Sequence, residues 1–134
     1  MAGGQFTPVR LSISGIEAAT SISDERRLEN RTLVNGAGVA LGDVDGDGWV
    51  DIYLCLLDQP NVLYRNLGGW RFEDVTQTSG TGLLGRLSRG AVFADADGDG
   101  DLDVVTVEEK GPYLARGYEG KELGVIWYEN PVRH

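Results

Sequence analysis

The chain has 134 residues, a net charge of −9, 41% hydrophobic residues and 20 glycines. This composition fits one modest, turn-rich globular β domain or a piece of a larger protein. Because no basic patch is present to meet phosphates, the sequence predicts no nucleic-acid partner and no attraction to an anionic membrane surface. No apolar run approaches the length of about 18 residues that a membrane span needs, so membrane insertion is not expected.

The first residues lack the charged and apolar regions of a signal peptide, so either export is not encoded here or the sequence begins after the signal. Residues 5–10 form a short extended segment, in which Pro8 suits an edge strand or the start of a strand. Residues 11–36 are polar and irregular. Within them, residues 23–29 predict either one or two helical turns or a solvated loop.

A first repeat begins near residue 38. Strands are predicted at residues 39–41, 52–57, 62–66 and 70–75, with an acidic loop between the first two and a turn at Gly68 and Gly69 before the last. The second of these strands is apolar on both faces and predicts a strand that is covered on both sides. Cys55 lies in it and is interpreted as a buried small hydrophobe, and as the only cysteine it forms no internal disulfide.

A second repeat follows the connection at residues 76–89. Strands are predicted at residues 90–93 and 104–107, at an offset of 52 residues, and at residues 125–130, where the offset has grown to 64. Tyr128 and Asn130 match Tyr64 and Asn66. No fourth strand follows, but the Phe-x-x-Val pattern at the start of residues 5–10 resembles that at Phe72, so the missing strand is predicted at the N-terminus.

The two acidic loops, residues 43–51 and 95–103, carry carboxylates at loop positions 1, 3, 5 and 9 and glycine at position 6. Alternate carboxylates repel one another unless a cation lies between them, and a hard cation with oxygen ligands, above all calcium, fits best. Glycine allows the positive φ that wraps the loop, and position 7 offers its backbone carbonyl. The predicted ligands are Asp43, Asp45, Asp47, Trp49 and Asp51 in the first loop, and Asp95, Asp97, Asp99, Asp101 and Asp103 in the second.

These loops are not EF-hands, because the bidentate Glu that an EF-hand requires at position 12 is replaced by Leu54 and Thr106. Strand-like sequence follows each loop, so each loop joins two strands. The alternative is an acidic surface turn that binds nothing, and the second copy with the same ligand positions argues against it.

A repeat of about 40–50 residues with four strands is typical of a β-propeller blade. The predicted fold class is therefore all-β, with residues 36–76 as the first blade and residues 88–130 as the second, and residues 5–10 as the permuted fourth strand of that second blade. Residues 42–52, 61–66 and 72–76 resemble the FG-GAP/VCBS repeat, the blade of integrin α-subunit propellers. Residues 88–95 resemble the subgroup related to cartilage acidic protein and the ASPIC/UnbV proteins.

The resemblance covers residues 36–108 well and residues 124–130 in part. It implies one calcium ion per blade, two per chain, bound at loop positions 1, 3, 5, 7 and 9. It also implies a secreted protein in an extracellular or periplasmic setting, where millimolar calcium suits sites with affinities of about 10⁻⁴–10⁻³ M.

The leading functional hypothesis is a non-enzymatic, calcium-binding module for extracellular adhesion or recognition, in which calcium is structural. A lectin is the alternative, with Trp49, Trp70, Trp127, Tyr113 and Tyr118 available to bind sugar, although packing is favoured for Trp70 and Trp127. A further alternative is a non-catalytic fragment of a larger secreted propeller protein or of a polysaccharide-active enzyme. An enzyme is not expected, because the sequence contains no nucleophile elbow, no catalytic triad and no phosphate-binding loop.

Two blades do not close a propeller. The chain is therefore either a fragment of a longer propeller, an engineered unit, or one protomer of an assembled ring. We expect a cyclic homo-oligomer, a trimer or tetramer, in which the N-terminal strand of each chain completes the last blade of its neighbour.

Overall fold

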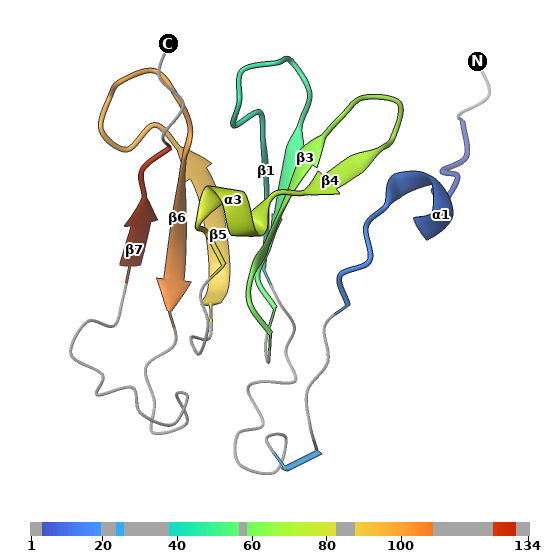
Figure 1. Ribbon diagram of the computed structural model, residues 1–134, viewed down its shortest axis with the longest axis horizontal. Coiled ribbons are helices and arrows are strands. Elements are labelled where there is room, and N and C mark those ends of the chain that lie inside the picture. Colours follow the sequence, from blue (N-terminus) through green and yellow to red (C-terminus); the bar gives the residue numbers. More distant parts are fainter. Residues whose placement is uncertain are drawn as a thin grey trace.

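A computed structural model of the protein describes residues 4–19, 24–25, 38–56, 59–82, 88–108 and 125–130, which form two antiparallel sheets side by side (Figure 1). The first sheet has the order β1 (Val39–Gly42), β2 (Asp51–Leu54), β3 (Val62–Asn66), β4 (Phe72–Asp74). The second has the order β5 (Ser88–Ala94), β6 (Asp103–Glu108), β7 (Val125–Tyr128). The predicted all-β class with antiparallel strands is confirmed.

The strand register places both acidic loops at the same end of the molecule. Gly42 pairs with Asp51, so residues 43–51 begin and end on adjacent strand ends. Ala94 pairs with Asp103 in the same way, and residues 95–103 form the equivalent connection in the second sheet. Both loops project from the upper end of the sheets in Figure 1. Each loop therefore joins two antiparallel strands, as predicted.

The hydrophobic core lies between the two sheets. Ala40, Tyr53 and Leu63 share one face of the first sheet and pack with Val104 of the second. The ring of Tyr53 meets Phe93 edge to face, with a centroid separation of 6.4 Å. Cys55 is fully buried in this cluster, as the sequence predicted.

Close approach at Gly42 shows how tightly the sheets pack, because a Cβ atom there would lie 2.8 Å from the Phe93 ring. On the opposite face of the second sheet, Val92 and Val107 are about half exposed. They alternate with the core residues of β5 and β6, so this face points away from the first sheet.

A buried polar group also connects the sheets. Asn61 is 1% exposed and donates from Nδ2 to the Tyr53 hydroxyl at 3.1 Å and to the Ser88 hydroxyl at 2.7 Å. Its side-chain oxygen accepts the Leu56 N–H, and the Tyr53 hydroxyl donates to the Thr81 carbonyl at 2.8 Å. A buried amide with its hydrogen bonds satisfied costs little and fixes one relative position of the two sheets.

The N-terminal part lies beside the first sheet, on the side away from β7 (Figure 1). No described strand includes residues 5–10, and the Phe6 side chain is fully exposed. The Tyr64 hydroxyl accepts the Glu17 and Ala18 N–H groups, which holds the following segment against β3. Within one chain, residues 5–10 therefore do not complete the second sheet, and completion by a neighbouring chain stays a prediction.

The predictions that Trp70 lies in the fourth strand and that its side chain is packed are wrong. Its φ of 63° follows those of Gly68 (81°) and Gly69 (60°), so the turn contains three consecutive left-handed residues. Strand β4 begins at Phe72, and the Trp70 side chain is 68% exposed. The pair of glycines marked the turn correctly but did not reveal that the turn continues into the next residue.

Two helices of four residues, α1 (Leu11–Ser14) and α3 (Thr76–Ser79), were not predicted. A single helical turn is too short to show helical periodicity in a sequence. Both end at a left-handed glycine, Gly15 and Gly80, whose N–H bonds back to the first residue of the helix. Most of residues 23–29, together with Tyr113, Tyr118 and the Trp127 side chain, lies outside the described residues.

Candidate metal centres

The first acidic loop wraps around the Asp43 carboxylate. Asp43 accepts backbone hydrogen bonds from Gly46 at 2.9 Å, Asp47 at 3.1 Å and Gly48 at 2.8 Å. These bonds need a tight, curled backbone, which Gly46 and Gly48 supply with φ values of 74° and 89°.

The second acidic loop repeats this arrangement. Asp95 accepts the Gly98 N–H at 2.7 Å and the Gly100 N–H at 3.1 Å. Gly98 and Gly100 have φ values of 82° and 99°. The two loops therefore share a backbone shape as well as a sequence pattern.

The aspartate at position 9 of each loop is buried and accepts two backbone hydrogen bonds. Asp51 is fully buried and accepts the Val44 N–H at 2.9 Å and the Asn66 N–H at 2.7 Å. Asp103 is 1% exposed and accepts the Ala96 N–H at 3.0 Å and the Asn130 N–H at 2.7 Å. Each of these aspartates thus holds the start of its loop to the end of the third strand.

Asn66 and Asn130 contact the acidic loops, and no role was predicted for either from the sequence. Besides the backbone bonds above, Asn66 donates from Nδ2 to the Val50 carbonyl at 2.9 Å, and Asn130 donates to the Leu102 carbonyl at 2.9 Å. Their signal was visible in the sequence, because both stand two residues after a tyrosine at matching places in the repeats. Their contacts with the loops depend on the strand register, which the sequence pattern did not supply.

Burial and backbone hydrogen bonds shift the pKa values of Asp51 and Asp43 in opposite directions. Burial raises the pKa of Asp51 against the effect of its two backbone N–H donors, and the charges of Asp45 and Asp47 raise it further. Burial acts to raise the pKa of Asp43 as well, but the Gly48, Asp47 and Gly46 N–H groups outweigh it and lower the pKa.

In the second loop, the Asp99 N–H acts to lower the pKa of Asp97, but desolvation and the charges of Asp99 and Asp103 outweigh it and raise the pKa. A cation placed among these groups would relieve the carboxylate repulsion that adds to the effect of desolvation on these pKa values.

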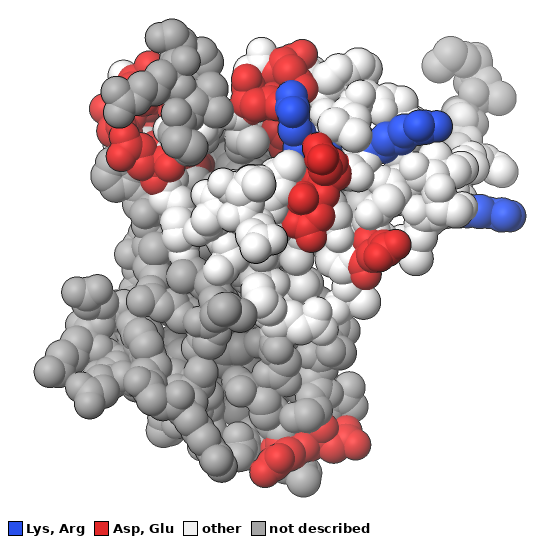
Figure 2. All heavy atoms as spheres, viewed as in Figure 1, with Lys and Arg blue, Asp and Glu red and all other residues white. Residues whose placement is uncertain are grey.

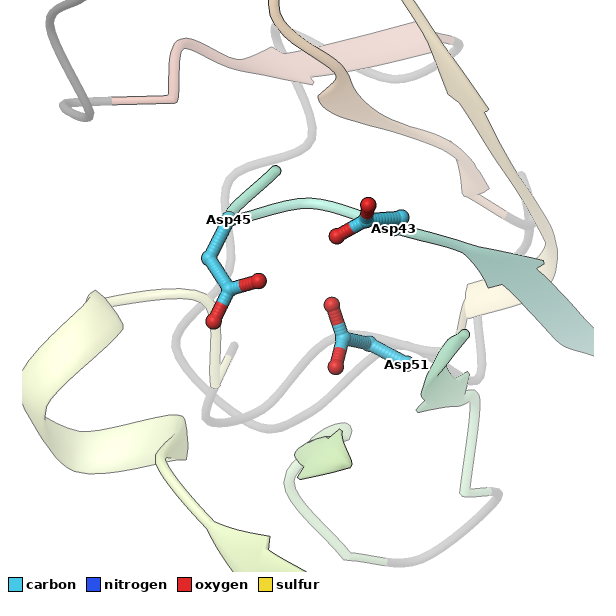
Figure 3. A group of neighbouring side chains, drawn as sticks. All are labelled: Asp43, Asp45 and Asp51. Carbon is cyan, nitrogen blue, oxygen red and sulfur yellow. The ribbon is translucent and has the colours of Figure 1, made fainter. Parts of the chain in front are cut away.

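Three of the predicted ligands in each loop converge. One carboxylate oxygen each of Asp43, Asp45 and Asp51 lies within 4.8 Å of the others, and Figure 3 shows the three carboxylates facing a common space. In the second loop the converging group is Asp95, Asp97 and Asp99. Ligand roles for these six, and for Asp47, Trp49, Asp101 and Asp103, stay predictions.

The remaining predicted ligands are placed by local contacts. Asp47 accepts the Trp49 N–H at 2.9 Å, and Asp99 accepts the Asp101 N–H at 3.1 Å. The Trp49 side chain is 52% exposed, and its ring lies 3.2 Å from where a Cβ on Gly68 would be. The Trp49 ring therefore lies against the turn between β3 and β4, while its backbone N–H bonds to Asp47 within the loop.

The donor set fits a hard divalent cation. Every converging side chain offers carboxylate oxygen and none offers nitrogen or sulfur, which is the preference of calcium among the common protein metals. Gly48 and Gly100 leave open space where a Cβ would stand. Figure 2 shows acidic side chains gathered at the end of the molecule where the two loops lie.

One basic side chain reaches the first loop. Arg65 of β3 has its Nε 2.6 Å from Asp45 Oδ2 and its Nη2 3.8 Å from Asp47 Oδ2. No role was predicted for Arg65, because it stands 18 and 20 positions along the chain from Asp47 and Asp45.

Comparison with known proteins identifies the repeat. Residues 43–106 match the family model of the FG-GAP-like repeat, so this part of the chain carries an FG-GAP-like repeat and the resemblance found in the sequence is confirmed. The chain is 29% identical to cartilage acidic protein 1 of Xenopus tropicalis over 99 residues, which is 74% of this chain and 15% of that protein.

Cartilage acidic protein 1 of Mus musculus and that of Homo sapiens are each 30% identical over 110 residues, 80% of this chain, and the match covers 17% and 16% of their lengths. The chain thus spans only a small part of the curated relatives that it matches. No solved structure gave a significant match. Among the described residues, no helix has the length and apolar character needed to cross a membrane.

Proposed function

We propose that the chain is a calcium-binding, propeller-type repeat module that serves extracellular recognition and has no catalytic role. The observation that carries this proposal is the matching geometry of the two acidic loops. Each has a curled backbone around the first aspartate and a buried aspartate at position 9 that holds the loop to the third strand. Each also has three converging carboxylates, at positions 1, 3 and 9 in the first loop and at positions 1, 3 and 5 in the second.

Calcium would have a structural task at these sites. It would reduce the repulsion among the carboxylates of each loop and hold together the ends of two antiparallel strands, β1 with β2 and β5 with β6. The ion would be held by Asp43, Asp45, Asp47, Asp51 and the Trp49 carbonyl in the first loop. In the second loop it would be held by Asp95, Asp97, Asp99, Asp103 and the Asp101 carbonyl. The carboxylates are better explained as such ligands than as an acid–base pair.

The exposure of the second site supports an extracellular setting. Asp95, Asp97 and Asp99 are exposed, and such partly hydrated sites bind calcium with dissociation constants of about 10⁻⁴–10⁻³ M, which only extracellular calcium saturates. The name of the relatives, cartilage acidic protein, supports the same setting.

Isothermal titration calorimetry with calcium tests the proposal. We expect two ions per chain in the intact protein. The variant D43N/D95N, which keeps the shape of the first aspartate and removes its charge, should bind neither ion. Absence of calcium binding to the folded intact chain at millimolar concentration would refute the proposal.

Glycan binding is a second candidate, favoured by one specific observation. Trp49 and Trp70 lie at the same turn, at Gly68 and one residue after Gly69, and both side chains are more than half exposed. Two adjacent exposed tryptophans offer a surface on which sugar rings stack. Binding on a glycan array that Trp70→Ala abolishes would support this candidate, and an array without signal would reject it.

A further inference from the structure

The two acidic loops differ at one equivalent position. The residue before Asn66 is Arg65, and the residue before Asn130 is Glu129. Both asparagines donate their backbone N–H to the position-9 aspartate of their own loop, at 2.7 Å in each case. Arg65 and Glu129 therefore occupy corresponding backbone positions beside the two loops, with opposite charge.

The arginine acts directly on the first loop. Its Nε is 2.6 Å from Asp45 Oδ2, and Asp45 is one of the three converging carboxylates of that loop. The Asp45 side chain is 19% exposed and that of Arg65 is 47% exposed, so water screens the pair only in part. Arg65 lies within β3, paired with Glu73 on β4, so its backbone cannot move away from the loop freely.

The loops also differ in their own charge. The first contains four aspartates, because position 7 is Trp49, and the second contains five, because position 7 is Asp101. Arg65 reduces the negative charge around the first loop, whereas the residue at the corresponding backbone position in the second repeat is an acid, Glu129. Calcium affinity of such loops rises with the number of negative charges around the ion.

We propose that Arg65 and Glu129 make the two calcium sites unequal, so that the second loop binds calcium first and the first loop binds it more weakly. This inference rests on the proposed calcium-binding function. In the first loop, calcium competes with the guanidinium for the Asp45 carboxylate and is repelled by its charge. In the absence of calcium, the same guanidinium takes the place of a cation and holds the first loop near its bound shape.

Arg65 alone is expected to weaken calcium binding by the first loop about tenfold. One unit charge a few Å from a divalent ion changes its binding severalfold to tens of fold at the effective dielectric constants of a protein surface, and partial exposure keeps the effect near the lower end. As calcium rises, the second loop should fill at least about one decade of concentration before the first.

The test measures calcium affinity in chains that keep one site. D95N/D97N retains the first loop, and D43N/D45N retains the second. Arg65→Gln should tighten calcium binding by the first loop about tenfold, and Glu129→Arg should weaken binding by the second by a similar factor. Arg71→Gln is the matched control: it removes the same charge from the turn after β3 without an ion pair to the loop, and should change affinity less than twofold.

A second measurement uses the chain with both loops intact, in case a single-site variant does not fold. Terbium replaces calcium, and its emission is sensitised by Trp49, the aromatic residue that the first loop contains. Arg65→Gln should shift this emission to about tenfold lower terbium concentration, and Arg71→Gln should not.

Equal affinities of the two loops, or equal effects of Arg65→Gln and Arg71→Gln, would overturn the inference while the calcium-binding proposal stands. Failure of the intact folded chain to bind calcium or terbium would instead overturn the calcium-binding proposal itself.

Discussion

Asn130 donates a hydrogen bond from Nδ2 to the main-chain oxygen of Val44, at 2.6 Å, and so links the second sheet to the first acidic loop. Its backbone N–H bonds to Asp103 of the second loop, and the Val44 N–H bonds to Asp51 of the first. Asn130 and Val44 therefore connect the position-9 carboxylates of the two loops through three consecutive hydrogen bonds.

Loss of the Asn130 side chain should destabilise the packing of the sheets. Asn130→Ala removes the donor to both the Val44 and the Leu102 carbonyl, and we expect the free energy of unfolding to fall by about 1–2 kcal/mol. Urea denaturation at fixed calcium measures this. Asn66→Ala is the control, because its Nδ2 bond to Val50 stays within the first sheet. A midpoint for Asn130→Ala equal to that of the unmodified chain would contradict the bridging role.

Calcium removal should lower thermal stability. A site saturated at 100 times its dissociation constant stabilises the folded state by about 2.7 kcal/mol, which corresponds to roughly 10 °C in a domain of this size. Scanning calorimetry in calcium and in excess chelator measures the change. Magnesium should restore little, because it gives up its water reluctantly. Superimposable curves with and without chelator would show that the metal has no structural role.

Single ligand substitutions should remove single sites. Asp45→Ala and Asp97→Ala each delete a converging carboxylate, and calorimetry should show one bound calcium in place of two. Trp49→Ala should leave both sites nearly intact, because this residue is predicted to offer only its carbonyl and its ring rests on Gly68. If Trp49→Ala abolished binding and Asp45→Ala did not, the predicted ligand positions would be wrong.

Ring assembly is a proposal that deletion of the N-terminal segment tests. We propose a cyclic trimer or tetramer in which residues 5–10 of each chain pair with the edge of β7 in its neighbour. Light scattering after size exclusion in millimolar calcium should show the oligomer, and deletion of residues 1–10 should dissociate or aggregate it. A folded monomer that the deletion leaves unchanged would reject ring assembly.

The parts of the fold that the sequence predicted are those with local signals. The acidic loops and the strands on either side follow from spacing and alternation within about 20 residues, and β1 and β3 fall close to the predicted ranges. Contacts such as Arg65 with Asp45 and Asn130 with Val44 were missed because they depend on strand register and on the packing of one sheet against the other. The backbone of Trp70 was missed because a left-handed tryptophan is uncommon.

The outward face of the second sheet differs in exposure from the equivalent face of the first sheet. Val92 and Val107 stand 52 residues after Ala40 and Cys55, yet they are 53% and 51% exposed where Ala40 and Cys55 are 5% and 0% exposed. The face of the first sheet that packs against the second sheet therefore has a counterpart on the second sheet, and this counterpart is exposed. A third sheet of the same kind would cover it and expose another copy of the same surface. Growth in this direction has no internal stopping point, so only ring closure or a differently shaped cap terminates the series.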